Sequence, residues 1–123
     1  MADLLELVAQ GIHNGWCEYK KQQGVVWGEE RTETTHPHLI EWNKLDNESQ
    51  NQDRFIAARI LEKWLDGTIH NGSLPEAIHN SWVTWIKVNR REHPHAHPFG
   101  VAHPEGAEEH ELQAKHISQI LPQ

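Results

Sequence analysis

Cysteine and basic residues are both scarce in this sequence. Cys17 is the single cysteine among 123 residues, so no disulfide can form within the chain, and a reducing, cytoplasmic environment is expected. Eighteen acidic residues outnumber eleven lysines and arginines, for a net charge of −7. That balance argues against a nucleic-acid polymer as a partner, because binding one requires basic surface that neutralises phosphates. It leaves room for a small anionic ligand held by a few local cations.

Membrane and catalytic motifs are missing as well. No segment approaches the ~20 apolar residues of a membrane span, and residues 1–6 lack the basic and apolar regions of a signal peptide. There is no glycine-rich phosphate loop, no Gly-x-Ser-x-Gly and no His-Glu-x-x-His. Cys17 and His13 have the spacing of helical neighbours, but no third group accompanies them. We therefore favour a buried thiol over a nucleophile, and expect neither an enzyme nor a cofactor.

An internal repeat is the strongest positive signal. Ile12-His-Asn-Gly-Trp16 recurs as Ile78-His-Asn-Ser-Trp82 at an offset of 66, and His36-Pro-His38 recurs as His93-Pro-His95 at an offset of 57. The loss of nine residues from the second copy, opposite Gly24–Arg31, reconciles the two offsets. Residues 1–66 and 74–121 are therefore interpreted as two copies of one unit, joined by a linker at 67–73.

Each copy has the pattern helix, irregular segment, helix. Apolar residues at spacings of three and four predict helices near 3–21, 46–65, 74–91 and 106–121. Residues 24–27 are expected to form a short strand or hairpin. Neither helix pair is large enough to bury a core alone, so we expect one compact, mostly α domain with short extended segments and a pseudo-two-fold axis. Trp16 and Trp82 should then face each other across that axis.

Four motifs in the first copy resemble a known family. They are Ile12-His-Asn-Gly-Trp16, Trp27-Gly-Glu-Glu-Arg31, His36-Pro-His38 with Trp42, and Asp53-Arg54. In this order they resemble the RyR domain, a repeat found in tandem in ryanodine receptors and in small bacterial and phage proteins. The second copy is degenerate: it lacks the Trp-Gly-x-x-Arg loop and has His110-Glu111 where the first has Asp53-Arg54.

The resemblance implies a non-catalytic helical module with an adenine nucleotide between the two repeats. Prokaryotic members are thought to sense nucleotide signals in conflicts between cells and viruses. Carried over by motif, Trp16 and Trp82 would stack on the ring, with polar contacts from His36, His38 and Asp53.

Each of these residues also has an interpretation that needs no ligand. Tryptophans on helical stripes usually pack in the core, and cations near a helix end complement its dipole. Here the cations are Lys20, Lys21 and Arg31 in the first copy, with Lys87, Arg90 and Arg91 in the second. The His-Pro-His segments suit either a structural bracket or donors to a ligand. Weighing the duplication with the resemblance, we predict a ligand site formed by Trp16, Lys20, Arg31, His36, His38, Asp53, Trp82, His93 and His95.

Three functions from different classes follow from these observations. The first is non-enzymatic binding of an adenine-containing signal, of the ADP-ribose, cyclic ADP-ribose, ATP or cyclic-oligonucleotide type, by a sensor or a sequestering protein. Because no effector domain is evident, we lean towards sequestration. The second is a protein-interaction or homo-oligomerisation module that uses exposed tryptophans. The third is a metal-binding protein based on the histidines at 93–103, although no cysteine accompanies them and incidental surface histidines are favoured.

Overall fold

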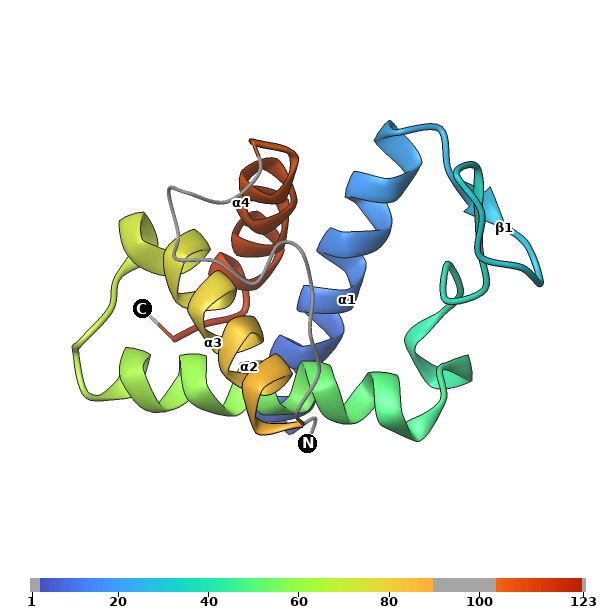
Figure 1. The fold of residues 1–123 in the computed structure, drawn as a ribbon. Coiled ribbons are helices and arrows are strands. Elements are labelled where there is room, and N and C mark those ends of the chain that lie inside the picture. The colour runs from blue at the N-terminus through green and yellow to red at the C-terminus, as the bar shows by residue number, and fades with distance from the viewer. Residues whose placement is uncertain (1–2, 90–103, 123) are drawn as a thin grey trace.

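The computed structural model describes residues 3–89 and 104–122, the side chains of 104–107 excepted. Within these ranges the chain is mostly helical, which confirms the predicted fold class (Figure 1). The helices are α1 (Leu4–Gln22), α2 (Asn47–Leu65), α3 (Leu74–Val88) and α4 (Pro104–Ser118). Two strands, β1 (Val26–Trp27) and β2 (Thr35–His36), and two 3-10 turns, η1 (Trp42–Lys44) and η2 (Asn71–Ser73), lie between helices.

The helix boundaries lie within two residues of the predicted ones except at the end of α3, which was expected to reach residue 91 but ends at Val88, and at the end of α4. That helix was expected to reach residue 121 but ends at Ser118. The backbone N–H groups of Ile120 and Leu121 both bond to the Ile117 carbonyl in a closing turn. Leu121 is nevertheless buried, because the turn directs it back to the core. Apolar spacing alone could not separate this arrangement from a longer helix.

The short strands place the long α1–α2 connection beside α1. Val26 pairs with Thr35 and Trp27 with His36 in parallel register, so β1 is the predicted short strand but not part of a hairpin. The turn after α1 uses Gly24 at a φ of 80°, a conformation that glycine adopts without steric cost. In Figure 1 this segment lies on the far side of α1 from α4.

The core forms where the predicted apolar stripes meet. Each first helix of a pair packs on both second helices: α1 contacts α2 and α4, and α3 contacts the same two. This pattern agrees with the expected two-fold relation of the copies; the axis and the copy boundaries themselves stay predictions. The buried centre comprises Val8, Ile12, Ile56, Ala57, Ile60, Leu74, Ile78, Ala114 and Ile117.

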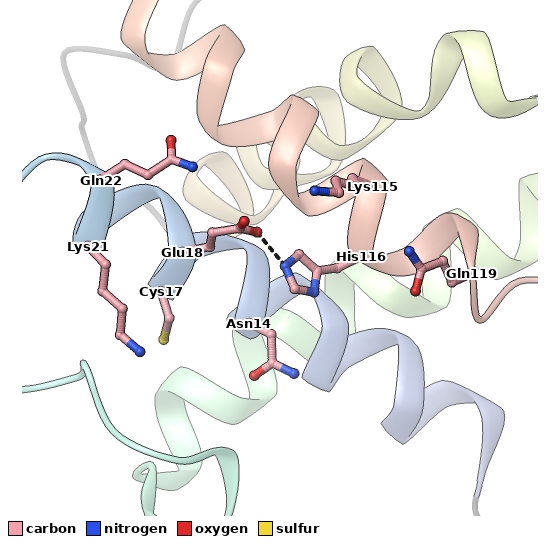
Figure 2. A pocket seen from close by; sticks show the side chains of 8 residues that line it. All are labelled: Asn14, Cys17, Glu18, Lys21, Gln22, Lys115, His116 and Gln119. Carbon is pink, nitrogen blue, oxygen red and sulfur yellow. Dashed lines mark hydrogen bonds and ion pairs between the residues drawn. The ribbon is translucent and has the colours of Figure 1, made fainter.

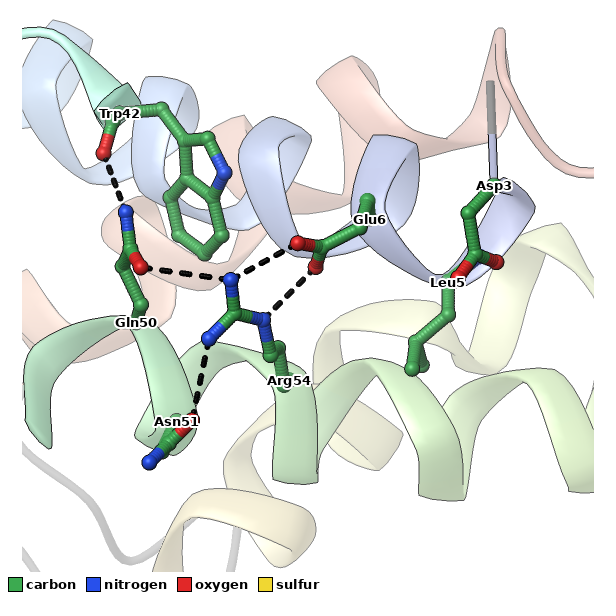
Figure 3. Close-up of polar contacts among 7 residues, drawn as sticks. All are labelled: Asp3, Leu5, Glu6, Trp42, Gln50, Asn51 and Arg54. Atoms are coloured by element: carbon green, nitrogen blue, oxygen red, sulfur yellow. Dashed lines mark hydrogen bonds and ion pairs between the residues drawn. The ribbon is translucent and has the colours of Figure 1, made fainter. Parts of the chain in front are cut away.

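A polar brace joins α1 to α2 at the motif that begins with Asp53 (Figure 3). The Arg54 guanidinium donates to both carboxylate oxygens of Glu6 at 2.8 Å and lies over the Trp42 ring at 5.5 Å. Gln50 Nε2 donates to the Trp42 carbonyl at 2.7 Å. A bidentate pair on an aromatic face fixes both distance and orientation. It therefore sets how α2 lies on α1, and with it where the neighbouring Asp53 points.

None of the helices in the described part of the chain combines the length and apolar character needed to cross a bilayer.

Candidate functional site: a polar cavity between the helices

A cavity of about 650 Å³ lies where all four helices meet the connection between α1 and α2. Its floor is apolar and its walls carry rings, cations and carboxyls. The lining residues are His13, Trp16, Lys20, Arg31, His36, His38, Leu45, Asp46, Glu48, Ser49, Gln52, Asp53, Ile56, Ile78, His79, Trp82, Ile86, Glu109, His110 and Gln113.

Most of the residues predicted to form a ligand site lie together in this cavity. They are Trp16, Lys20, Arg31, His36, His38, Asp53 and Trp82. The other two, His93 and His95, lie outside the described residues, as do Arg90 and Arg91. The sequence motifs thus converge in space on one cavity, although they are spread from α1 to α3.

Of the cations that follow the two tryptophans, Lys21 and Lys87 do not line the cavity. Lys21 follows Lys20 by ~100° around the helix and lies in a different hollow. In the second copy the position equivalent to Lys20 is the apolar Ile86, and Lys87 is exposed. The basic wall therefore comes from the first copy among the residues described.

Trp16 and Trp82 are half-buried rather than enclosed in the core. Each follows a buried histidine by one helical turn, and the rings lie 5.9 Å apart in both cases (His13–Trp16 and His79–Trp82). His36 meets Trp16 edge to face at 4.8 Å. Both indoles keep surface on the cavity, so burial among leucines and isoleucines, which would have ended the idea of an aromatic clamp, is not observed.

His36 and His38 form a bracket inside their own loop. The His38 N–H donates to His36 Nδ1 at 3.0 Å, and His38 Nε2 lies 3.5 Å from Asp46, which caps α2. Burial, together with the charges of Arg31, His38 and Lys20, lowers the pKa of His36 to about 4. A neutral ring whose Nδ1 accepts a hydrogen bond carries its proton on Nε2. His36 therefore offers an N–H donor without adding charge.

A chain of hydrogen bonds makes the opposite wall rigid. Gln113 Nε2 donates to the Ile12 carbonyl at 3.2 Å, which fixes the orientation of the amide because a carbonyl only accepts. Gln113 Oε1 therefore accepts from His110 Nδ1 at 2.9 Å. His110 Nε2 then accepts from His79 Nδ1 at 3.1 Å. Burial lowers the pKa of His110 to about 4 despite the Gln113 bond. The neutral tautomer is thereby fixed along a path that joins α1, α3 and α4.

Two carboxyls line the cavity without a partner among the described residues. Asp53 from α2 and Glu109 from α4 are half-buried, and neither has a hydrogen bond or ion pair with any described residue. Burial raises the pKa of Asp53 well above its usual range, and the charge of Glu109 raises it further. Burial also raises the pKa of Glu109 to about 7, against the opposing charge of Lys20. Their remaining exposed surface faces the cavity, which explains why groups with accessible area are still poorly solvated.

Several lining residues were not predicted from the sequence, although the alignment of the two proposed copies could have identified them. Each is the partner, at the offset of 66 or 57, of another residue in the same cavity. The pairs are His13–His79, Lys20–Ile86, Gln52–Glu109, Asp53–His110 and Ile56–Gln113. A two-fold axis through the cavity would produce this pairing. The members of most pairs differ in chemistry, however, so any such symmetry belongs to the backbone and not to the surface offered to a ligand.

Cys17 does not have the environment of a nucleophile. His13 Nε2 donates to the Ile40 carbonyl at 2.7 Å, so this nitrogen already carries a proton. It therefore cannot accept the proton of Cys17, whose Sγ lies 3.3 Å away. Burial raises the pKa of the Cys17 thiol to about 11, although Lys21 opposes the shift. Reactive cysteines have the reverse, a lowered pKa. The thiol is half-buried, which is more exposure than the sequence suggested.

A second hollow of about 690 Å³ lies on the outer side of the α1–α4 contact (Figure 2). Its walls are the long polar side chains Asn14, Cys17, Glu18, Lys21, Gln22, Lys115, His116 and Gln119. Glu18 and His116 pair across it at 2.6 Å. It has no tryptophan, tyrosine or phenylalanine side chain, and its carboxylate, Glu18, already pairs with His116. We therefore take the inner cavity as the candidate site.

Metal binding gains no support from the described ranges, which contain no group of three or more histidine, cysteine, aspartate or glutamate residues that could hold an ion. The histidines at 93–103 lie outside those ranges.

Comparison with known proteins gives one match. The family model described as RyR domain matches residues 1–68. No curated protein and no solved structure gives a significant match to the chain.

Proposed function

The chain belongs to the RyR domain family, and on that premise we propose that the inner cavity binds an adenine-containing nucleotide without changing it chemically. The ligand is of the ADP-ribose, cyclic ADP-ribose, ATP or cyclic-oligonucleotide type, and the protein acts as a sensor or as a sequestering protein for it. The observation that carries the proposal is the meeting of Trp16, Trp82, Lys20 and Arg31 in a single cavity.

The size and lining of the cavity suit a nucleotide. Its volume of about 650 Å³ falls within the ~300–1,000 Å³ of sites that bind small molecules. Half-buried indoles give a planar base apolar surface on which to stack, a contact worth ~1–3 kcal/mol per base. An isoleucine floor of Ile56, Ile78 and Ile86 excludes water below the base.

The donors for phosphate lie close to one of the indoles. Lys20 follows Trp16 by one helical turn, and Arg31 and the Nε2–H of His36 border the same region. Arg31 and Lys20 both act on the His36 ring through their charge, which places the three groups together. A phosphate bound there would receive charge-assisted hydrogen bonds in a protein whose surface is otherwise acidic.

The cavity has no arrangement for nucleophilic attack among its described residues. The cysteine nearest to it holds its proton firmly, and the bonded imidazole of His110 has a pKa of about 4, too low for a general base at neutral pH. These two groups favour binding without turnover, and we assign Glu109, whose pKa is about 7, to ligand binding and not to proton transfer.

A calorimetric and thermal-shift panel tests the proposal directly. ATP, ADP-ribose, cyclic ADP-ribose and cyclic di-AMP should be titrated into the purified protein, with inorganic phosphate and divalent cations as separate arms. A binding nucleotide raises the Tm by mass action and quenches indole fluorescence. A response to divalent cations that chelation abolishes would support metal binding instead. If none of the nucleotides produces heat or a Tm shift, nucleotide binding is wrong.

Trp16→Ala and Trp82→Ala should each weaken nucleotide binding by about 10-fold or more, since one stacking face is worth about 1.4 kcal/mol. Folding should suffer less than from Ile60→Ala, because both indoles are only partly buried whereas Ile60 is fully buried. Trp27→Ala is the matched control, since Trp27 is 55% exposed and does not line the cavity. Equal loss of affinity in all three tryptophan variants would argue against a specific clamp.

Self-association is a second candidate that one observation favours. Val26 and Trp27 on β1 are 60% and 55% exposed, and exposed apolar strands are sites of pairing between chains. An elution volume that changes with protein concentration in the wild type but not in Trp27→Ala would support it.

A further inference from the structure

We propose that Asp53 and Glu109 form a ribose site, so that the cavity selects nucleotides whose 2′- and 3′-hydroxyls are free over cyclic oligonucleotides. This inference rests on the proposed nucleotide binding and narrows it to one ligand class. It also assigns a binding role to Glu109, which lies outside the family's matched segment at residues 1–68.

The first argument is that the two carboxyls are placed for a ligand and not for the fold. They come from different helices, α2 and α4, and line the same cavity, where the charge of Glu109 also raises the pKa of Asp53. Carboxyls that stabilise a fold accept helix-cap or ion-pair hydrogen bonds, as Asp46 and Glu6 do here. Asp53 and Glu109 have no such bond with the described residues.

The second argument concerns what such a pair can bind. The pair gives a phosphate no cationic donor and repels it wherever a carboxyl is ionised, while a vicinal diol offers two O–H donors at the spacing of neighbouring oxygens. Carboxylates bind the ribose hydroxyl in dinucleotide-binding proteins for the same reason. A metal ion would need more ligands than two carboxyls, and the described residues supply no group of three. The chemistry therefore favours hydroxyls.

The third argument is the order of groups along the cavity wall. Lys20 lines the same cavity and acts through its charge on both His36 and Glu109, so it lies near the donor region of Arg31 and His36 and also near the carboxyl pair. A nucleotide has the same sequence of parts, since the ribose connects the phosphate to the base. In the proposed orientation the phosphate lies at Arg31 and His36, the ribose lies at Asp53 and Glu109, and the base lies against the indoles. No like charges meet in this orientation.

The repeat pairs support a single orientation for an asymmetric ligand. Gln52 stands opposite Glu109 in the alignment of the copies, and His110 stands opposite Asp53. These aligned positions thus supply one carboxyl pair and not two symmetric ones. A cyclic dinucleotide with two equal halves would meet the carboxyls with one half and different groups with the other, and its 3′-oxygens are esterified.

The test compares ATP with 2′,3′-dideoxy-ATP, which keeps the base and phosphates and lacks the diol. Wild-type protein should bind ATP at least about 10-fold more tightly than the dideoxy analogue, since a site that binds a hydroxyl discriminates against a ligand that lacks it. Asp53→Ala and Glu109→Ala should reduce that ratio towards one. Asp53→Asn and Glu109→Gln, which keep an acceptor oxygen and the side-chain shape, should give intermediate ratios. Glu108→Gln, an exposed neighbour on α4, should keep the full ratio.

The outcomes separate this inference from the proposed function. Equal affinity for ATP and its dideoxy analogue, or tighter binding of cyclic di-AMP than of ATP, leaves nucleotide binding in place and overturns the ribose site. If ADP-ribose binds and ATP does not, the same comparison is made with 2′-deoxy-ADP-ribose, and equal affinity overturns the site. If no nucleotide binds, both proposals fail together.

Discussion

Neighbouring residues on α1 face different surroundings, and their chemistry differs accordingly. Trp16 and Lys20, one helical turn apart, border the inner cavity. Cys17 and Lys21, each a single position further along, border the outer hollow. A rotation of ~100° per residue is enough to separate the two environments. His13 connects them, because its ring lines the cavity while its Nε2 faces Cys17.

Cys17 should react slowly with thiol reagents in the folded protein. With a pKa of about 11, its thiolate fraction at pH 8 is more than about 100-fold below that of a free cysteine with a pKa near ~8.5. Alkylation by iodoacetamide should therefore be about two orders of magnitude slower in the native state than in 6 M urea at the same pH. The rate is followed by intact mass. Native reaction as fast as in urea would show that the thiol is neither buried nor held by His13.

At the scale of helices, the α1–α4 contact depends on glycine. A Cβ added at Gly15 would lie 2.4 Å from the Cα of Gln113, and one added at Gly11 would lie 2.9 Å from an Ile117 methyl. The second copy has Ser81 at the position of Gly15, buried against other neighbours. The two helix pairs are therefore not interchangeable in detail, although their motifs align.

Gly15→Ala should destabilise the fold by about 2 kcal/mol or more, because the clash is with backbone and α4 must move. Alanine would otherwise stabilise a helix by ~1 kcal/mol relative to glycine, so the sign of the change reports the contact. Urea unfolding followed by tryptophan fluorescence measures it. Asn14→Ala, at an exposed neighbouring position, should change stability by no more than about 0.5 kcal/mol. A stabilised Gly15→Ala variant would contradict the close approach of α1 and α4.

Sequence reasoning predicted elements better than their contacts. Amphipathic spacing located all the described helices, because a buried face repeats every 3.6 residues whatever it packs against. The parallel pairing of Val26 with Thr35 was not predictable, since it depends on the path of the loop and not on local pattern. In the site, identity between copies selected Trp16 and Trp82. It could not select Glu109 or Gln113, which differ from their repeat partners and enter the cavity through helix packing alone.

At the scale of the whole molecule, the cavity concentrates groups whose ionisation opposes folding. Lowered pKa values at His36 and His110 mean that folded protein binds fewer protons than unfolded protein below about pH 6.5, so stability falls as the pH drops through that range. The raised pKa of Glu109 acts in the opposite direction. Between about pH 4.5 and pH 7 the folded carboxyl holds a proton that the unfolded one has lost, and its contribution falls as pH rises.

Glu109→Gln should therefore stabilise the ligand-free protein at pH 8 and have little effect at pH 5. The charged groups that act on Glu109 are Lys20 from α1 and Asp53 from α2; of these, only Lys20 favours its charged form. The gain in unfolding free energy at pH 8 should be about 1–2 kcal/mol. A fully enclosed carboxyl would gain ~1.4 kcal/mol for each unit by which its pKa is raised, and the gain here is smaller because the carboxyl keeps accessible surface. Urea unfolding at both pH values measures it, with Glu108→Gln as the exposed control. A variant less stable than wild type at pH 8 would mean that the ionised carboxyl supports the fold, and that the cavity does not hold it ready for a ligand.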